Sequence, residues 1–169
     1  MKQLNPKAVW LFFFSYLISF LIAFFVILFI FASGVGLLLR PGLIALASLL
    51  LLIVIIAFTY FWAKLSYHYY HYQLTDDCFR KELGVVYKKY VSIPYDRIQN
   101  IDINRGIIDR LLGLSTLLIQ TAGSSMAIGN RHSYGFGAEG TIPGLSKENA
   151  EELRDELIRR AKKSTNQGL

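Results

Sequence analysis

Two long stretches without a single charged side chain dominate the first half of this sequence. They cover residues 9–32 and 43–62, which are 24 and 20 residues long. A helix needs about 20 apolar residues to cross a hydrocarbon core about 30 Å thick. A charge at the bilayer centre costs roughly 2.5–3.5 kcal/mol on insertion scales, so membrane spans avoid charge. The sequence therefore predicts two transmembrane helices.

The connector between these stretches, residues 33–42, is short and contains three glycines and one proline. Glycine and proline favour turns, so the two helices are expected to form an antiparallel hairpin. Trp10 opens the first stretch, Trp62 closes the second, and Lys64 follows it. Tryptophan prefers the headgroup region. We expect Trp10, Trp62 and Lys64 to anchor the open end of the hairpin at one membrane interface.

Basic residues near the helix ends predict the orientation of the hairpin. Lys2, Lys7 and Lys64 lie near the termini of the hairpin, whereas the connector contains Arg40 alone. The positive-inside rule then predicts that both termini, and the domain that follows, are cytoplasmic at the cell (plasma) membrane. A cleaved signal peptide is the alternative, but its apolar region is normally only about 7–15 residues long.

The charge distribution separates the membrane part from the rest. All 12 acidic residues lie at or after Asp76, and the part from residue 63 onward has 15 basic residues. A net charge of +3 there, with no basic run longer than two, does not indicate nucleic-acid binding. Mild positive charge beside a membrane fits an anionic leaflet. Cys78 is the only cysteine, so an internal disulfide is excluded.

Short strands are predicted after residue 66, because β-branched and aromatic runs alternate with turn signals. A slip in the apolar alternation between Gln99 and Asn100 predicts a β-bulge. Residues 107–112 fit a helical turn or a strand, and residues 123–140 are glycine-rich and loop-like. The expected strands are residues 67–75, 78–83, 85–93, 97–104 and 115–121, with residues 141–142 closing the sheet.

One amphipathic helix is predicted at the end. Ser146 is the expected N-cap, and a polar tail is expected at residues 164–169. An apolar stripe at helical spacing needs an apolar surface to cover. The stripe consists of Ala150, Leu153, Leu157, Ile158 and Ala161.

Strands followed by one helix predict an α+β domain, with a bent antiparallel sheet or partly open barrel capped by the C-terminal helix. The predicted organisation is a membrane hairpin within residues 1–65, a β domain at residues 66–163 and the tail.

Several motifs of the second half resemble a known family. They are YQLTDD at residues 72–77, SIPYDRIQNIDINRG at 92–106, RLLGLSTLLIQTAG at 110–123 and IPGLSKENAEEL at 142–153. Together with the two preceding helices, these strings resemble the bacterial pleckstrin-homology-like (bPH2, YdbS-like) domain membrane protein family. The resemblance implies a strongly bent sheet of about seven strands with a helical cap, and it brings no catalytic residues.

The family motif residues are expected to be structural. Pro94 would end a strand and Gly113 would allow a tight turn. Ile98, Ile101, Leu114 and Leu118 are expected to face the core. The sequence departs from the family pattern in the long glycine-rich stretch at residues 123–140. The motif positions are Pro94, Arg97, Ile98, Gln99, Gly113 and Thr116.

Two groups of residues are candidates for lipid or partner contact. The first is Arg80, Lys81, Lys88 and Lys89, near the first strand pair. Adjacent residues on a strand point to opposite faces, so these four cannot all converge. The second group is Arg131, His132, Tyr134 and Phe136 in the glycine-rich stretch. Solvated strand faces and an ordinary surface loop are the plainer interpretations of the two groups.

The sequence gives little support for catalysis or for metal binding. His68 and His71 are three apart on a predicted strand, so they would face opposite ways and bind no metal together. We expect no catalytic residues, no cofactor and no metal.

The sequence therefore predicts a membrane-anchored, non-enzymatic interaction module that binds a membrane or cytoplasmic protein or self-associates as a homo-oligomer. The alternatives are a sensor of anionic lipid headgroups and an accessory subunit of a transport or export system.

Overall fold

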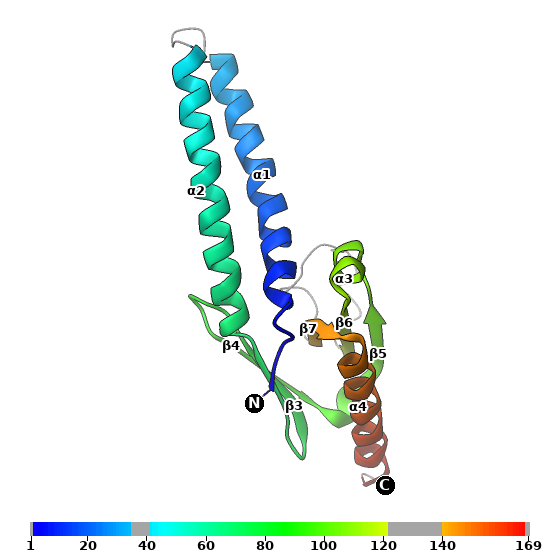
Figure 1. Cartoon of the computed structure of the whole chain (residues 1–169). Coiled ribbons are helices and arrows are strands. Elements are labelled where there is room, and N and C mark those ends of the chain that lie inside the picture. Colours follow the sequence, from blue (N-terminus) through cyan, green and yellow to red (C-terminus); the bar gives the residue numbers. More distant parts are fainter. Residues whose placement is uncertain (1, 35–40, 122–139, 168–169) are drawn as a thin grey trace.

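The computed structural model describes residues 2–34, 41–121 and 140–167. A helical hairpin stands on a small β domain, and the N-terminus lies at the junction between them (Figure 1). In chain order the elements are β1 (Lys2–Gln3), α1 (Ala8–Gly34), α2 (Pro41–His68), β2 (His71–Leu74), β3 (Cys78–Leu83), β4 (Lys89–Pro94), the 3-10 helix η1 (Tyr95–Arg97), β5 (Ile98–Asn104), α3 (Ile107–Leu112), β6 (Leu114–Thr121), β7 (Gly140–Ser146) and α4 (Lys147–Gln167).

The helices α1 and α2 have the length and composition of membrane spans. Their apolar parts have mean hydropathies of 2.7 and 2.8. Large apolar side chains on both helices face outward, with Phe29 76% and Ile53 55% exposed. A core helix of a soluble protein would bury such side chains, whereas lipid covers them in a membrane. The predicted pair of membrane helices is therefore confirmed.

The boundary between α2 and the β domain differs from the prediction. The expected strand at residues 67–75 is wrong in its first part, because α2 continues to His68 and β2 begins only at His71. The Tyr69 amide donates to the Leu65 carbonyl at 3.0 Å, which continues the helical pattern. No glycine or proline lies between Trp62 and His71 to end the helix earlier. His68 and His71 are therefore on different elements.

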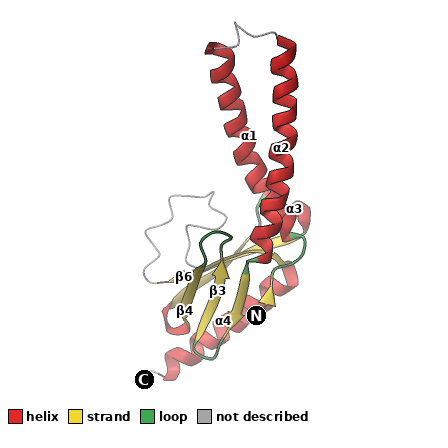
Figure 2. Ribbon diagram, turned by 90° about the vertical axis from the view of Figure 1, so that its left-hand side faces the viewer, coloured by secondary structure: helices red, strands yellow, loops and turns green. Residues whose placement is uncertain are grey.

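The β domain consists of two antiparallel sheets rather than one continuous sheet (Figure 2). The first has the order β1-β2-β3-β4 and the second has the order β5-β6-β7. The helix α4 packs against η1 and all three strands of the second sheet. The predicted α+β domain, with a partly open arrangement of strands and a helical cap, is confirmed. The strand β1 was not predicted, because a strand of two residues is too short to show an alternation of apolar and polar side chains.

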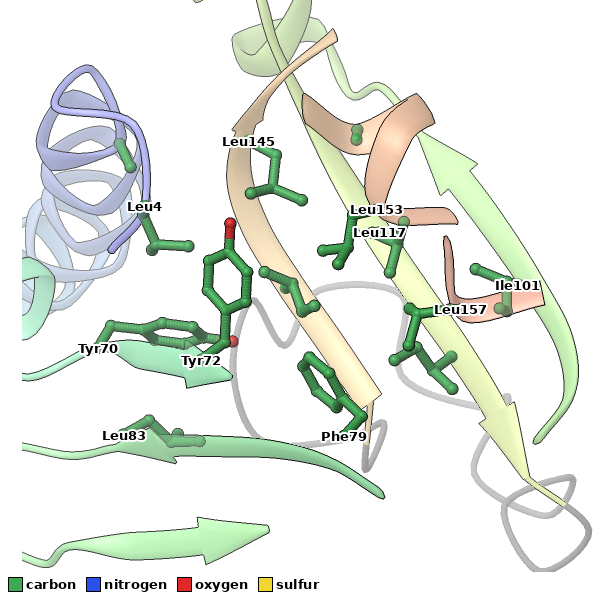
Figure 3. Close-up of a cluster of buried hydrophobic side chains, with 14 of the residues drawn as sticks. Leu4, Tyr70, Tyr72, Phe79, Leu83, Ile101, Leu117, Leu145, Leu153 and Leu157 are labelled. Atoms are coloured by element: carbon green, nitrogen blue, oxygen red, sulfur yellow. The ribbon is translucent and has the colours of Figure 1, made fainter. Parts of the chain in front are cut away.

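The core lies between the two sheets and α4. Side chains from all three layers point into it, including Phe79, Leu117, Leu145 and Leu157 (Figure 3). The predicted bulge is confirmed, since the register of β5 against β6 shifts between Ile98 and Asn100.

Of the four expected core residues, three are correct and one is wrong. Ile101 and Leu114 are buried, and Ile98 is partly buried against the core. Leu118 is not in the core, where Leu117 and Ile119 stand instead. A second register shift, between Ser115 and Leu117 against β7, changes which residues face inward. A one-residue slip reverses the faces of a strand, which explains the error.

The C-terminal helix α4 begins where the sequence predicted, but it ends later than predicted. The Asn149 amide donates to Ser146 Oγ at 3.2 Å, so Ser146 caps α4 as expected. Ala150, Leu153 and Leu157 are buried. The helix continues to Gln167, past the expected beginning of the polar tail.

One backbone carbonyl ties the two sheets together. The carbonyl of Thr141 on β7 accepts the Tyr70 hydroxyl at 2.7 Å and Lys81 Nζ at 3.2 Å. Tyr70 lies between α2 and β2, directly before His71, and Lys81 lies on β3 of the first sheet. Burial raises the pKa of Tyr70, so the hydroxyl stays protonated and donates. A buried hydrogen bond of this kind contributes about 1 kcal/mol.

The hairpin is attached to the β domain at the beginning of α1. The Asn5 amide donates to the Gly144 carbonyl on β7 at 3.1 Å, and Ala8 is fully buried. Gly144 has a φ of +69°, and a Cβ placed on it would lie 2.4 Å from the Ala8 Cβ. The Tyr67 hydroxyl donates to the Leu4 carbonyl at 3.3 Å. The segment that precedes α1 is therefore bound both to β7 of the domain and to α2 of the hairpin.

Replacing Gly144 with alanine tests this attachment, and Gly113→Ala is its matched control. Gly113 has nearly the same φ, +70°, but nothing lies within 4 Å of an added Cβ. Both variants carry about 1–2 kcal/mol of left-handed backbone strain, and G144A adds an overpacking cost of about 1–3 kcal/mol. Thermal unfolding in mild detergent should give the order wild type, G113A, G144A from the highest Tm to the lowest. Equal Tm values for the two variants would contradict the close contact.

Candidate interaction site

The outer face of the β3–β4 pair carries an exposed mixture of basic, acidic and aromatic side chains. Arg80 pairs with Ser92 and Glu82 with Tyr90 across the two strands, so these four side chains share one face. Lys88 Nζ lies 3.4 Å from Glu82 Oε1. The Lys88 side chain is exposed and the Glu82 side chain is partly buried, and a pair at the surface of this kind contributes at most about 1 kcal/mol. The face offers charge and an aromatic ring to a ligand outside the protein.

Within the part of the chain that the structure describes, β4 is one of the two edge strands of the first sheet, and the other is the two-residue strand β1. The strand β4 pairs with β3 on one side only, and its next neighbour in sequence, β5, belongs to the second sheet. Lys89, Tyr90 and Ser92 are exposed, and Tyr90 is 68% exposed. An edge strand presents backbone donors and acceptors to any additional strand.

The four predicted basic residues do not form one cluster. The side chain of Lys81 is buried between the sheets, where it donates to Thr141, whereas Arg80 is exposed on the opposite face. Lys89 is the first residue of β4, Lys88 directly precedes it, and both are exposed. The expectation that alternation would separate Arg80 from Lys81 is confirmed. The second candidate group, Arg131, His132, Tyr134 and Phe136, lies outside the described residues.

The family motif residues occupy strand ends and turns. Pro94 is the last residue of β4, and Arg97 ends η1 with an exposed side chain. Ile98 and Gln99 begin β5 at the bulge. Gly113 ends α3 in the left-handed conformation.

Thr116 is buried on β6, and its hydroxyl lies 3.5 Å from Asp109 Oδ2. That carboxylate oxygen also accepts the Gly106 amide at 3.0 Å, before the start of α3.

A charged groove of about 710 Å³ runs between α4 and the first sheet. Arg160 stabilises its wall, because Nε donates to Glu156 at 2.6 Å and Nη1 donates to the Thr75 carbonyl at 2.6 Å. Hydrogen bonds from Arg160 and Arg159 hold the pKa of Glu156 below its usual range. The lining residues are Lys2, Gln73, Leu74, Glu152, Asp155, Glu156, Arg159 and Arg160. Three basic and three acidic side chains balance one another, so the groove favours no charged ligand.

A second, apolar groove of about 380 Å³ lies between α1 and α2 near the connector. It is lined by Phe24, Ile27, Leu28, Leu43, Ile44, Ala47, Ser48 and Leu51. All of these residues belong to the two membrane helices, so acyl chains have direct access to the groove.

The predicted interface anchors lie at the open end of the hairpin, where it meets the β domain. Trp10 is 47% exposed and lies beside Tyr60 of α2, with ring centroids 6.2 Å apart. Trp62 stacks on Phe58, with centroids 5.8 Å apart. Lys64 is exposed, one residue after the buried Ala63. The two tryptophans mark one level along the hairpin, close to the β domain.

Several exposed apolar residues were not singled out in the sequence. They are Val86, Tyr87 and Tyr90 around the start of β4, and Ile107 and Leu111 on α3. The apolar residues after Gly84 were predicted to begin a strand at residues 85–93, and this prediction is wrong in its first part, because β4 begins only at Lys89 and residues 85–88 connect β3 to β4.

Among the described residues, no group of three or more His, Cys, Asp and Glu side chains is placed to bind a metal ion. The exposed features of the domain are an open strand edge, a charged face and apolar protrusions. These features suit the binding of a macromolecule or a membrane surface.

A membrane hairpin joined to two antiparallel sheets and a capping helix defines a membrane-associated PH-like protein. The bacterial PH domain family matches residues 9–161, so this chain belongs to that family. The curated relative UPF0699 transmembrane protein YdbT of Bacillus subtilis (strain 168) is 33% identical over 91 residues. The matched region is 53% of this chain but only 16% of that relative. No solved structure matches the chain.

Proposed function

We propose that this chain is a non-enzymatic interaction module at the membrane, and that β4 binds an extended segment of a protein partner. The observation that carries the proposal is the open edge of β4, beside the exposed Tyr90 and Lys89. An extended peptide that adds a strand to a sheet edge gains main-chain hydrogen bonds, and side-chain contacts then select its sequence.

The side chains around β4 favour a partner strand that carries acidic and apolar residues. Arg80 and Lys89 are exposed on either face of the pair, and Tyr90 supplies an aromatic surface. Tyrosine and arginine are enriched at protein interfaces. A second copy of this chain is one possible partner, since β4 edges of two molecules can pair with each other.

The membrane hairpin supports such a role because it confines the domain to a surface. Confinement raises the effective concentration of domain and partner, so that a single six-residue strand can give useful affinity. The protein partner is thus a membrane protein or a protein recruited to the same membrane.

Site-specific photo-crosslinking tests the proposed edge. A benzophenone amino acid replaces Tyr90 in the full-length chain, and the matched control replaces Asn100, which is exposed on β5. In native membranes the Tyr90 position should give one discrete covalent adduct and the Asn100 position none. An adduct of twice the chain mass would identify a second copy as the partner.

Reversing the local charge makes the test specific. Lys89→Glu, combined with the photo-reactive residue at Tyr90, should reduce the adduct several-fold, because an acidic partner strand is then repelled. Equal adduct yields at Tyr90 and Asn100, or no adduct at either position, would overturn the proposed edge.

The cytoplasmic orientation of both termini and of the β domain is the second part of the proposal. Lys2, Lys7 and Lys64 lie at the domain end of the hairpin and support it. The exposed turn residue Asp76 offers a reporter in the Cys78→Ser background. A membrane-impermeant maleimide should label Asp76→Cys only after the cells are opened. Labelling in intact cells would place the domain on the other side of the membrane.

A further inference from the structure

We infer that the β domain also docks directly on the bilayer that its own hairpin crosses, through two apolar protrusions at the base of the hairpin. The first is the turn between β3 and β4, with Val86 and Tyr87. The second is α3, with Ile107 and Leu111. These four residues are called the membrane rim. The inference rests on the membrane-spanning hairpin and not on the proposed partner at β4.

The strand register brings the β3–β4 turn to the membrane side of the domain. Glu82 on β3 pairs with His71, which follows the end of α2 by only three residues. The strand β2 runs away from α2, and β3 runs antiparallel to it, back towards α2. The turn that follows β3 therefore lies beside the last turns of α2. Figures 1 and 2 both show this turn rising beside the base of α2.

The helix α3 reaches the same level on the other side of the hairpin. Leu114, which follows α3, pairs with Ser146, two residues after the Gly144 that contacts Ala8 of α1. The helix α3 itself packs against α1. Figure 1 shows α3 and the β3–β4 turn on opposite sides of the hairpin base.

The orientation of α3 directs its apolar residues away from the domain. Asp109 is buried towards β6, and Ile107 and Leu111 lie on the opposite face of the helix, because they precede and follow Asp109 by two residues. Their side chains are 79% and 82% exposed. The described residues of the domain therefore leave most of the surface of these two side chains uncovered.

The exposed apolar residues of the β domain are concentrated at this end. In the described chain outside α1 and α2, the large exposed apolar side chains are Tyr69, Val86, Tyr87, Tyr90, Ile107 and Leu111. Four of these six form the membrane rim, and Tyr69 directly follows α2. The opposite end of the domain, with the β2–β3 turn, carries the exposed acidic residues Asp76 and Asp77.

Charge around the protrusions also fits a membrane. Lys88 and Lys89 follow the β3–β4 turn, and Arg105 and Arg110 flank the exposed face of α3. Each basic residue near an anionic surface gains from the negative potential of that surface. Apolar residues with basic neighbours are the usual composition of an interfacial anchor.

The position of the membrane rim beside the hairpin favours the bilayer as its binding partner. A bilayer surrounds the hairpin on every side, so it lies against both protrusions at once. Trp10 and Trp62 place the headgroup region close to the β domain. The rim is thus continuous with a surface that is already buried in lipid, and Tyr87 adds an aromatic ring suited to the headgroup level.

Fluorescence in vesicles tests the inference on the full-length chain. An environment-sensitive dye is attached to a single cysteine at Tyr87 or Leu111 in the Cys78→Ser background. The matched control is Asp76→Cys, at the opposite end of β3. Each protein is reconstituted in vesicles of phosphatidylcholine and phosphatidylglycerol. Quenching is measured with aqueous iodide and with lipids that carry a nitroxide near the headgroup.

The rim labels should be quenched several-fold less by iodide than the Asp76 label, and several-fold more by the nitroxide lipids. Equal quenching at all three positions would overturn the inference. Repeating the measurement at increasing lipid-to-protein ratios separates lipid from protein. Shielding that persists on dilution supports docking on the bilayer. Shielding that disappears would mean that a second copy covers the rim, and it would also overturn the inference.

Discussion

The close contact between the beginning of α1 and Gly144 of β7 is the constraint on which the arrangement of hairpin and domain depends. No side chain larger than hydrogen fits at Gly144, because an added Cβ would come within 2.4 Å of the Ala8 Cβ. The Asn5 amide binds the Gly144 carbonyl at the same place. The second connection, between α2 and β2, is only two residues long, and one of them, Tyr70, is buried. Two short attachments of this kind position a domain, whereas a flexible linker would not.

The position of the domain decides which of its surfaces face the membrane and which face the partner. The Thr141 carbonyl binds Tyr70 and Lys81, and thereby joins the chain that leaves α2 to both sheets. The turn at Val86 and the helix α3 then lie beside the hairpin, while the open edge of β4 extends away from it. A membrane-facing end and an open edge on the same small domain are consistent with a module that is held close to the bilayer and presents one strand to a partner.

The sequence predicted the elements whose signals are local. Charge-free runs predicted α1 and α2, the Ser146 hydroxyl predicted the start of α4, and broken alternation predicted the bulge at Gln99. Features that depend on tertiary contacts were missed. The register shift after Ser115 exchanged Leu118 for its neighbours in the core. The aromatic-rich run that begins at residue 67 suggested a strand, but α2 continues through residue 68.

The candidate site was harder to predict than the fold, for a physical reason. In the sequence Lys81 resembled the other three basic residues near the first strand pair. In the structure its ammonium group is buried and donates a hydrogen bond to the Thr141 carbonyl on β7. Only the packing of the two sheets creates that environment. Residues 107–112 fitted a helical turn or a strand, and the sequence did not single out Ile107 and Leu111 as exposed. Their exposure follows from the direction in which Asp109 anchors α3.

The distance between hairpin and domain tests the central claim most directly. Nitroxide labels at Leu50→Cys, on the lipid-exposed part of α2, and Asp96→Cys, in η1, are introduced into the Cys78→Ser chain in lipid nanodiscs. Pulsed electron paramagnetic resonance then gives the distribution of distances between the two labels. A single narrow distribution is the result expected of a domain fixed to its hairpin through Gly144. A broad distribution would show a domain on a flexible tether and would contradict this account.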